Sequence, residues 1–131
     1  MRRLHALVLP LALTLGSVAL SGCDLFRSRS GDEEAQLRRL QTQIDALVNP
    51  ATASDAAFCR TIEYGSKPCG GPSRYVIYSA ERADTAALGR LARRYTEVES
   101  ALNRRTGRVS DCLAMGAPRV ALEGGVCSVK R

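Results

Sequence analysis

The sequence predicts an α+β fold: one long helix packed on a small antiparallel sheet, stapled by disulfides and preceded by a separate amphipathic helix. Three observations lead to this prediction. Apolar residues recur at spacings of three and four over residues 83–103, which is the period of a helix. Short segments rich in β-branched and aromatic residues lie beside glycine-rich and proline-rich turns. Four cysteines follow residue 58, which suits a small exported domain.

Composition divides the 131 residues into five segments. Residues 1–22 are predicted to be an export signal, 23–32 a tether, 33–49 an amphipathic helix, 50–57 a linker and 58–131 a disulfide-bearing α+β domain. Loss of the first segment leaves about 110 residues, enough for one small domain with a thin core. The net charge is +6 with acidic residues interspersed, which favours an ordinary solvated surface over a polyanion-binding one.

The N-terminal segment has two arginines after Met1 and an apolar run over residues 6–20, ending in Leu20-Ser21-Gly22-Cys23. These four residues resemble the lipobox of bacterial lipoproteins. The resemblance implies a lipid on the thiol of Cys23, cleavage just before it, and anchoring of the domain to a membrane by acyl chains. The expected location is the bacterial cell envelope, facing the periplasm. Asp24 implies the inner membrane in enterobacterial lipoproteins, but other bacteria sort differently, so the choice of membrane stays open.

The predicted helix over residues 33–49 carries a single apolar stripe. Glu33 and Glu34 suit its first turn, and Asn49-Pro50 ends it. Packing of the stripe on its own domain is the favoured interpretation, and self-association or docking to a partner is the alternative. The stripe consists of Leu37, Leu40, Ile44 and Leu47.

Two strands are predicted on either side of a dense turn. Residues 59–64 form the first, and residues 65–72 cannot continue it because they contain two prolines and three glycines. Residues 74–79 are the strongest strand prediction and place apolar groups on both faces, so this strand needs cover on both sides. The long helix follows over residues 83–103, with Asp84 as its N-cap and Gly107 as its stop. Residues 119–122 and 126–130 resemble a closing hairpin.

Cys59, Cys69, Cys112 and Cys127 are expected to form two disulfides. Four cysteines allow three pairings, and the sequence does not choose among them. Local pairing of Cys59 with Cys69 and of Cys112 with Cys127 is favoured because each pair flanks a turn-rich segment. A metal site is not expected, since no Cys-x-x-Cys spacing is present.

The only histidine is His5, inside the segment expected to be cleaved. The mature chain then lacks the general base of Ser-His-Asp and Cys-His catalysis, so we expect neither an enzyme nor a cofactor. Glu97 and Glu99 lie two residues apart and do not face each other on a helix. The remaining candidate site is the turn containing Lys67, Gly70 and Gly71, with Arg74 close by, whose backbone N–H groups and cations suit an anion. A disulfide-stapled turn without a ligand is the favoured alternative.

Residues 59–131 also resemble small exported bacterial proteins, which implies one disulfide-bearing module and no activity. The function we expect is that of a membrane-anchored, non-catalytic interaction module with an envelope protein as partner. Nucleic acid is not an expected partner, because an exported domain seldom meets it. Two alternatives remain: a structural or stress-related lipoprotein held electrostatically on anionic surfaces, and an inhibitor of a secreted hydrolase.

Overall fold

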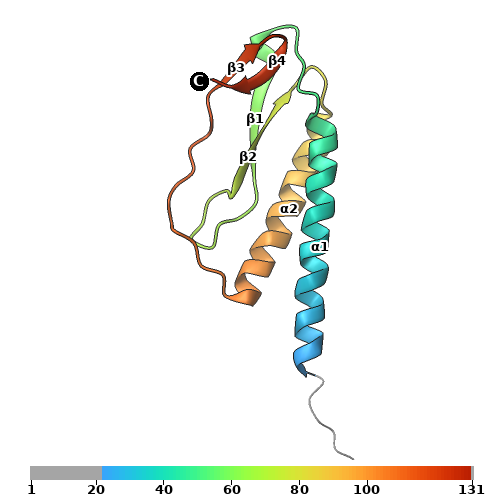
Figure 1. Cartoon of the computed structure of the whole chain (residues 1–131), viewed down its shortest axis with the longest axis vertical. Coiled ribbons are helices and arrows are strands. Elements are labelled where there is room, and N and C mark those ends of the chain that lie inside the picture. Colours follow the sequence, from blue (N-terminus) through green and yellow to red (C-terminus); the bar gives the residue numbers. More distant parts are fainter. Residues whose placement is uncertain (1–21, 131) are drawn as a thin grey trace, which may run out of the picture.

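A computed structural model describes residues 22–130 and confirms the α+β class (Figure 1). Residues 1–21, which hold almost all of the expected export signal, and Arg131 lie outside the described residues. The elements are α1 (Gly22–Val48), the short 3-10 helix η1 (Ala56–Phe58), β1 (Cys59–Tyr64), β2 (Arg74–Ser79), α2 (Thr85–Thr106), β3 (Val120–Glu123) and β4 (Val126–Val129).

The two helices lie side by side and run in opposite directions (Figure 1). The stripe predicted on α1 packs against the stripe of α2, so α1 is not separate from the domain but supplies half of its core. Packing of α1 on its own domain is thereby confirmed. The buried residues of this core are Leu37, Leu40, Ile44, Val48, Tyr64, Leu88, Ala92, Tyr95, Val98 and Leu102.

Residues 23–32, predicted to be a tether without regular structure, are helical, because α1 begins at Gly22. These residues lack an apolar period since they extend past the core, and extending an existing helix is far easier than starting one. Two ion pairs join α1 to the end of α2 where this extension begins. Glu33 pairs with Arg105, and Glu34 pairs with Arg108 at 2.8 Å.

The segment over residues 50–57, predicted to be a linker, is part of the folded body. Thr52 forms a bridge with Val126 of β4. The Ala53 N–H donates to the Gly125 carbonyl at 3.1 Å, and the Cys127 N–H donates to the Ala51 carbonyl at 2.9 Å. Small side chains let this backbone approach the edge of β4 and pair with it.

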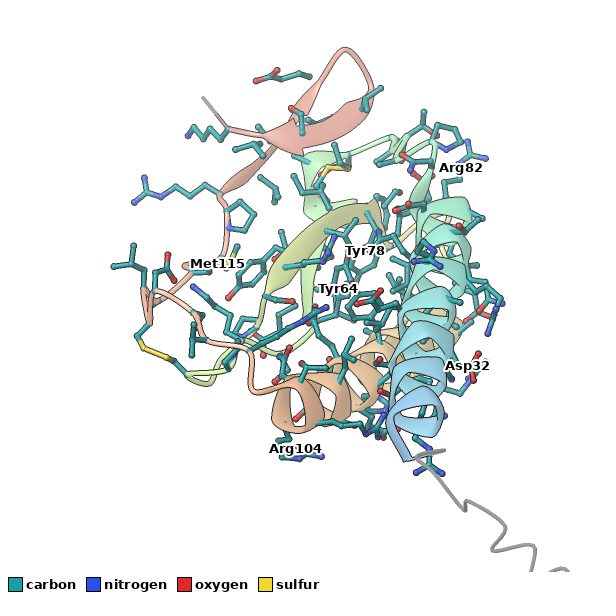
Figure 2. All side chains as sticks on the ribbon, turned by 60° about the horizontal axis from the view of Figure 1, so that its bottom comes forward. Asp32, Tyr64, Tyr78, Arg82, Arg104 and Met115 are labelled. Atoms are coloured by element: carbon teal, nitrogen blue, oxygen red, sulfur yellow. A yellow bond between two sulfur atoms is a disulfide. The ribbon has the colours of Figure 1, made fainter. Side chains whose placement is uncertain are left out.

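β1 and β2 form the predicted antiparallel hairpin, with Cys59 opposite Ser79 and Tyr64 opposite Arg74. One face packs on the two helices, and Tyr64 and Tyr78 point toward them in Figure 2. Tyr64 meets Tyr95 edge to face, and its hydroxyl donates to Oε1 of Gln41 at 3.0 Å. The hydroxyl is therefore satisfied although the ring is buried.

The other face of the hairpin is covered by the second hairpin, β3–β4. Cys59 and Ile77 pack there against Val120, Leu122 and Cys127. β2 is thus covered on both sides, as its apolar composition predicts. The β3–β4 hairpin lies at the opposite end of the molecule from the start of α1 (Figure 1).

α2 confirms the predicted caps. The Asp84 side chain accepts from the Ala87 N–H at 2.8 Å, and Gly107 ends the helix in the left-handed conformation with φ +63°. Glycine adopts this conformation without the steric penalty of a Cβ. The start of the helix and its end are therefore both encoded locally.

Both predicted disulfides form, but the favoured local pairing is wrong. Cys59 bonds to Cys127, and Cys69 bonds to Cys112. β1 separates Cys59 from Cys69, and its six residues span roughly 20 Å, whereas a disulfide needs Cα atoms within about 7 Å. Each cysteine instead bonds to the distant segment that packs over it.

Candidate functional site

The turn between β1 and β2 is fixed on α2 by side chains of the helix. The Gly65 N–H donates to Oγ1 of Thr96 at 2.8 Å, and Nδ2 of Asn103 donates to the Ser66 carbonyl at 2.7 Å. Gly65 has a φ of +77°, and a Cβ at this position would lie 2.0 Å from the Ser73 hydroxyl oxygen. Glycine is therefore required at the point where the chain leaves β1.

Glu99 is a buried carboxylate at the centre of this anchorage. Its Oε2 accepts from the Ser66 N–H and from the Ser73 hydroxyl, each at 2.6 Å. Such hydrogen bonds replace the water that a buried charge loses. Sequence reasoning missed this role, although Glu99 follows Tyr95 by four residues and so falls on the buried stripe of α2. Glu97, by contrast, is exposed and pairs with Arg94.

Lys67, predicted to serve an anion-binding turn with Gly70 and Gly71, points toward the loop after α2. Its Nζ donates to Oδ1 of Asp111 at 2.8 Å and to the Leu113 carbonyl at 2.7 Å. The hydrogen bond from Lys67 lowers the pKa of Asp111 below its usual value. The N–H groups of Lys67 and Gly70 bond to the carbonyls of Gly71 and Lys67. The cation and two of the N–H groups are therefore used within the protein.

Arg74, the fourth residue of that predicted site, faces the helices instead. Its guanidinium carbon lies 5.6 Å from the centroid of the Tyr95 ring, within cation–π range. Burial raises the pKa of Tyr95, and the Glu99 carboxylate acts in the same direction. Arg74 lines a hollow of about 530 Å³ beside α1, whereas Lys67 and Gly70 line another beside the end of α2. The structure does not bring Arg74 together with Lys67.

A loop without regular structure connects α2 to β3, over residues 108–119. The Cys69–Cys112 disulfide, the contacts of Lys67 and a hydrogen bond from the Tyr75 hydroxyl to the Met115 carbonyl (3.2 Å) hold it beside the β1–β2 hairpin. Figure 2 shows Met115 at this side of the molecule, away from α1. The loop exposes large apolar side chains that single-sequence patterns did not single out: Val109, Leu113 and Met115.

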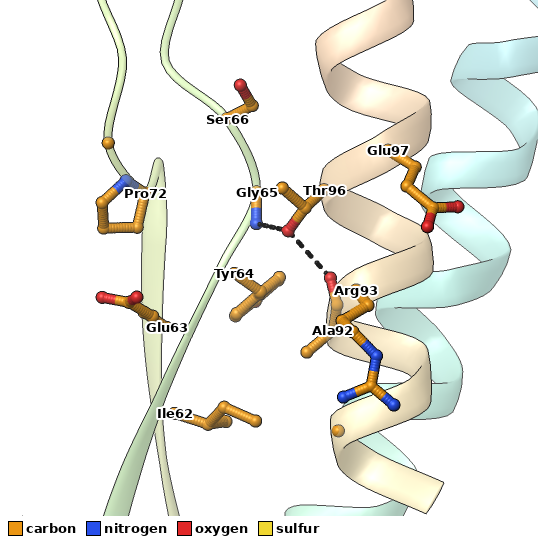
Figure 3. A pocket seen from close by; sticks show the side chains of 12 residues that line it. Ile62, Glu63, Tyr64, Gly65, Ser66, Pro72, Ala92, Arg93, Thr96 and Glu97 are labelled. Carbon is orange, nitrogen blue, oxygen red and sulfur yellow. Dashed lines mark hydrogen bonds between the residues drawn. The ribbon is translucent and has the colours of Figure 1, made fainter.

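A groove of about 580 Å³ runs between β1 and α2 (Figure 3). Apolar side chains of Ile62 and Ala92 lie inside it, and the charged side chains of Glu63, Arg93 and Glu97 lie around it. The groove combines an apolar interior with a charged rim. This is the composition of a surface that binds a partner of mixed polarity.

The groove follows from the dimensions of the two layers. Packed helices lie about 8–10 Å apart, whereas neighbouring strands lie about 4.8 Å apart. A two-stranded hairpin is therefore narrower than the two-helix layer beneath it. One hollow remains where β1 meets the flank of α2, and the other where β2 meets the flank of α1.

Within residues 22–130, no group of three or more His, Cys, Asp or Glu side chains is arranged to hold a metal ion. Among the helices in that same range, none has the length and apolar character needed to cross a membrane. No protein-family model, curated protein or solved structure matches the chain. The groove between β1 and α2 and the stapled loop over residues 108–119 are the candidate interaction surfaces.

Proposed function

We propose that the protein is a lipid-anchored module of the bacterial envelope that faces the periplasm and binds an envelope protein without catalysis. The observation that carries this proposal is the course of α1. The helix begins at Gly22, beside the expected lipid acceptor Cys23, and continues without a break to Val48 in the core. One rigid element then connects the lipid to the folded body.

This connection determines how the body is presented. Glu33, where the ion pairs to α2 begin, lies ten positions after Cys23, and at a rise of 1.5 Å per helical residue the two are roughly 15 Å apart along α1. The acyl chains supply the anchoring, at about 0.8 kcal/mol for each buried methylene. The groove and the stapled loop then stand beyond the headgroups, where a second protein reaches them.

The anchoring half of the proposal is tested by Cys23→Ala. We expect the variant to move from the membrane fraction to the soluble fraction and to lose labelling by a clickable fatty acid. The matched control is the double variant Cys69→Ala/Cys112→Ala, which removes two thiols and keeps the lipid acceptor. Membrane retention of Cys23→Ala without label contradicts a lipid anchor.

The binding half is tested in cells with a photocrosslinking amino acid at Arg93 in the groove, at Leu113 in the loop, or at Ala86 on an exposed part of α2 that lines neither surface. We expect one discrete protein adduct from Arg93 or Leu113 and none from Ala86. Absence of an adduct at all three positions, with normal expression and anchoring, contradicts an interaction module.

The stapled loop supports an inhibitor of a secreted hydrolase as a second candidate. Leu113 is 68% exposed and directly follows the disulfide-bonded Cys112. A loop held in one conformation loses little entropy on binding, which favours tight insertion into an active-site cleft. Inhibition of a secreted protease by the protein, abolished by Leu113→Asp, supports this candidate. Equal inhibition by the parent protein and by Leu113→Asp contradicts the inhibitor candidate.

The electrostatic alternative has less support. Lys67, Arg105 and Arg108 each pair with a carboxylate of the same chain, which reduces the positive charge available to an anionic surface. A strong fall in the binding of Cys23→Ala to anionic vesicles between low and high salt supports this alternative. Salt-independent binding, or none, contradicts it.

A further inference from the structure

Within residues 22–130, one edge of β1 pairs with β2 and the other edge pairs with no strand. Because the Ala80 N–H donates to the Phe58 carbonyl and antiparallel ladders alternate, Ile62 and Tyr64 direct their backbone groups toward β2. Thr61 and Glu63 therefore direct theirs away from it. The Gly65 N–H, two residues further on, follows this alternation and points to Thr96 on α2.

Across the part of the chain that the structure describes, the backbone groups of Thr61 and Glu63 on this edge have no hydrogen-bond partner. They present two N–H donors and two C=O acceptors at a spacing of two residues, roughly 7 Å. Only another extended backbone matches such a row of alternating donors and acceptors. Glu63 also lines the groove, so the open edge forms one of its sides.

The opposite side of the groove is the flank of α2. At Gly89 no side chain projects from this flank into the groove. Among the described residues, a Cβ on Gly89 would meet only the guanidinium of Arg93, at 3.5 Å, so packing does not require glycine here. Glycine inside a helix is less stable than alanine. At this position it leaves the groove open beside β1. Arg93 is exposed and, among the described residues, has no ion-pair partner.

We propose that an extended segment of another polypeptide adds to β1 as a third strand, lies over the flank of α2, and places a carboxylate against Arg93. This inference rests on the proposed function and specifies its partner as an acidic, extended peptide segment. A third strand at the usual spacing covers the part of α2 that the two-stranded hairpin leaves bare. Gly89 accepts its inward side chain. Of the charged side chains that line the groove, Glu97 pairs with Arg94 and Glu63 accepts from the Tyr75 hydroxyl. Among the described residues, Arg93 is the charged lining residue that has no such partner, so it selects the charge of the added segment.

A second copy of the chain cannot supply this third strand while both copies stay anchored to one membrane. Twofold pairing of β1 with itself runs the strands in opposite directions. Since α1 and β1 both follow the long axis of the molecule (Figure 1), the two α1 helices would then point to opposite ends. Two lipids on Cys23 would not reach the same membrane surface.

The test uses the full chain in detergent micelles and, as probe, a nine-residue peptide of alternating threonine and valine with a central aspartate. Amide hydrogen exchange is followed by NMR. We expect the probe to slow exchange at Thr61 and Glu63 by at least tenfold and to leave Ile62 and Tyr64 unchanged, because the latter amides already face β2. A probe with alternate amides N-methylated removes the donors that pair with β1 and should give no protection.

Two variants test the groove. Gly89→Leu fills it and should raise the Kd of the probe at least tenfold, whereas Ala86→Leu, an equal enlargement on an exposed part of the same helix, should leave the Kd unchanged. Arg93→Gln should raise the Kd of the aspartate probe and leave the Kd of an asparagine probe unchanged. Thermal unfolding of each variant verifies that the fold is kept.

Three results overturn the inference: no protection at Thr61 and Glu63, equal binding of the N-methylated probe, or protection that rises with protein concentration in the absence of probe, which indicates self-pairing. These readouts do not depend on the lipid. A negative result for strand addition can therefore be distinguished from a negative result for the lipid anchor, which is measured by membrane fractionation of Cys23→Ala.

Discussion

The carboxylate of Glu99 on α2 accepts the backbone N–H of Ser66, the second residue after β1, at 2.6 Å. This bond joins a helix to a turn that lies 33 residues earlier in the chain. It also places the end of β1 against the flank of α2, where the groove lies. The buried charge thus positions the candidate binding surface without lining it.

Glu99→Ala leaves two donors, the Ser66 N–H and the Ser73 hydroxyl, without their acceptor. Because hydrogen bonds to a charged, buried group are strong, we expect the free energy of unfolding to fall by about 2–4 kcal/mol. Urea denaturation measures this change. The matched control is Glu97→Ala, which removes an exposed pair with Arg94 and should cost no more than about 0.5 kcal/mol. Equal losses in the two variants contradict the assigned role of Glu99.

Gly65→Ala introduces a Cβ at positive φ and against the Ser73 hydroxyl and the Glu99 carboxylate. We expect a loss of about 3 kcal/mol or more, since the steric contact adds to a left-handed backbone penalty of about 1–2 kcal/mol. Gly70→Ala provides the comparison, because Gly70 also has positive φ but open space around it. Gly70→Ala should lower the free energy of unfolding by the backbone penalty alone. Equal free energies of unfolding for Gly65→Ala and Gly70→Ala would contradict this geometry.

The two disulfides should differ in accessibility rather than in the entropy they remove. Closed loops of 68 and 43 residues each correspond to about 4 kcal/mol in the chain-entropy model. The Cys59–Cys127 bond is buried, whereas Cys69 and Cys112 are exposed. Mild reduction followed by alkylation and mass spectrometry should label Cys69 and Cys112 first. Peptide mapping that joins Cys59 to Cys69 contradicts the fold.

Acid should loosen the stapled loop through Asp111. The hydrogen bond from Lys67 lowers the pKa of Asp111 from its ordinary 3.8, so the folded state favours the charged carboxylate. The stabilisation is present above the ordinary pKa and is lost as the pH falls through the lower, folded value. An NMR titration of the Leu113 amide, which donates to Asp111 at 3.3 Å, follows this loss. The Leu113 amide should show no such transition in Asp111→Asn. A titration midpoint above pH 3.8 in the parent protein would mean that the pKa of Asp111 is raised, which contradicts the assigned effect of Lys67.

Local patterns predict much of the fold. The period of α2, its N-cap Asp84 and its stop at Gly107 depend on neighbouring residues, and so do both hairpins. The start of α1 is not predictable in this way, because residues 22–32 extend past the core and carry no apolar period. The same holds for the pairing of Ala51 to Ala53 with β4, which depends on tertiary docking.

The candidate site is less predictable than the fold. Lys67 has the appearance of a ligand-binding cation, yet its partners Asp111 and Leu113 lie more than 40 residues away and are brought to it by the loop after α2. The groove arises from the unequal widths of a two-stranded hairpin and a two-helix layer, which no single segment encodes. Glu99 carries the one available signal, a charged residue on a buried stripe.

Mass spectrometry of the intact protein extracted from membranes tests the central claim most directly. A chain that begins at Cys23 and carries the added mass of a diacylglyceryl group on that residue is the expected result. A membrane-associated chain with an unmodified Cys23, or one that retains residues 1–22, contradicts the lipid-anchored account.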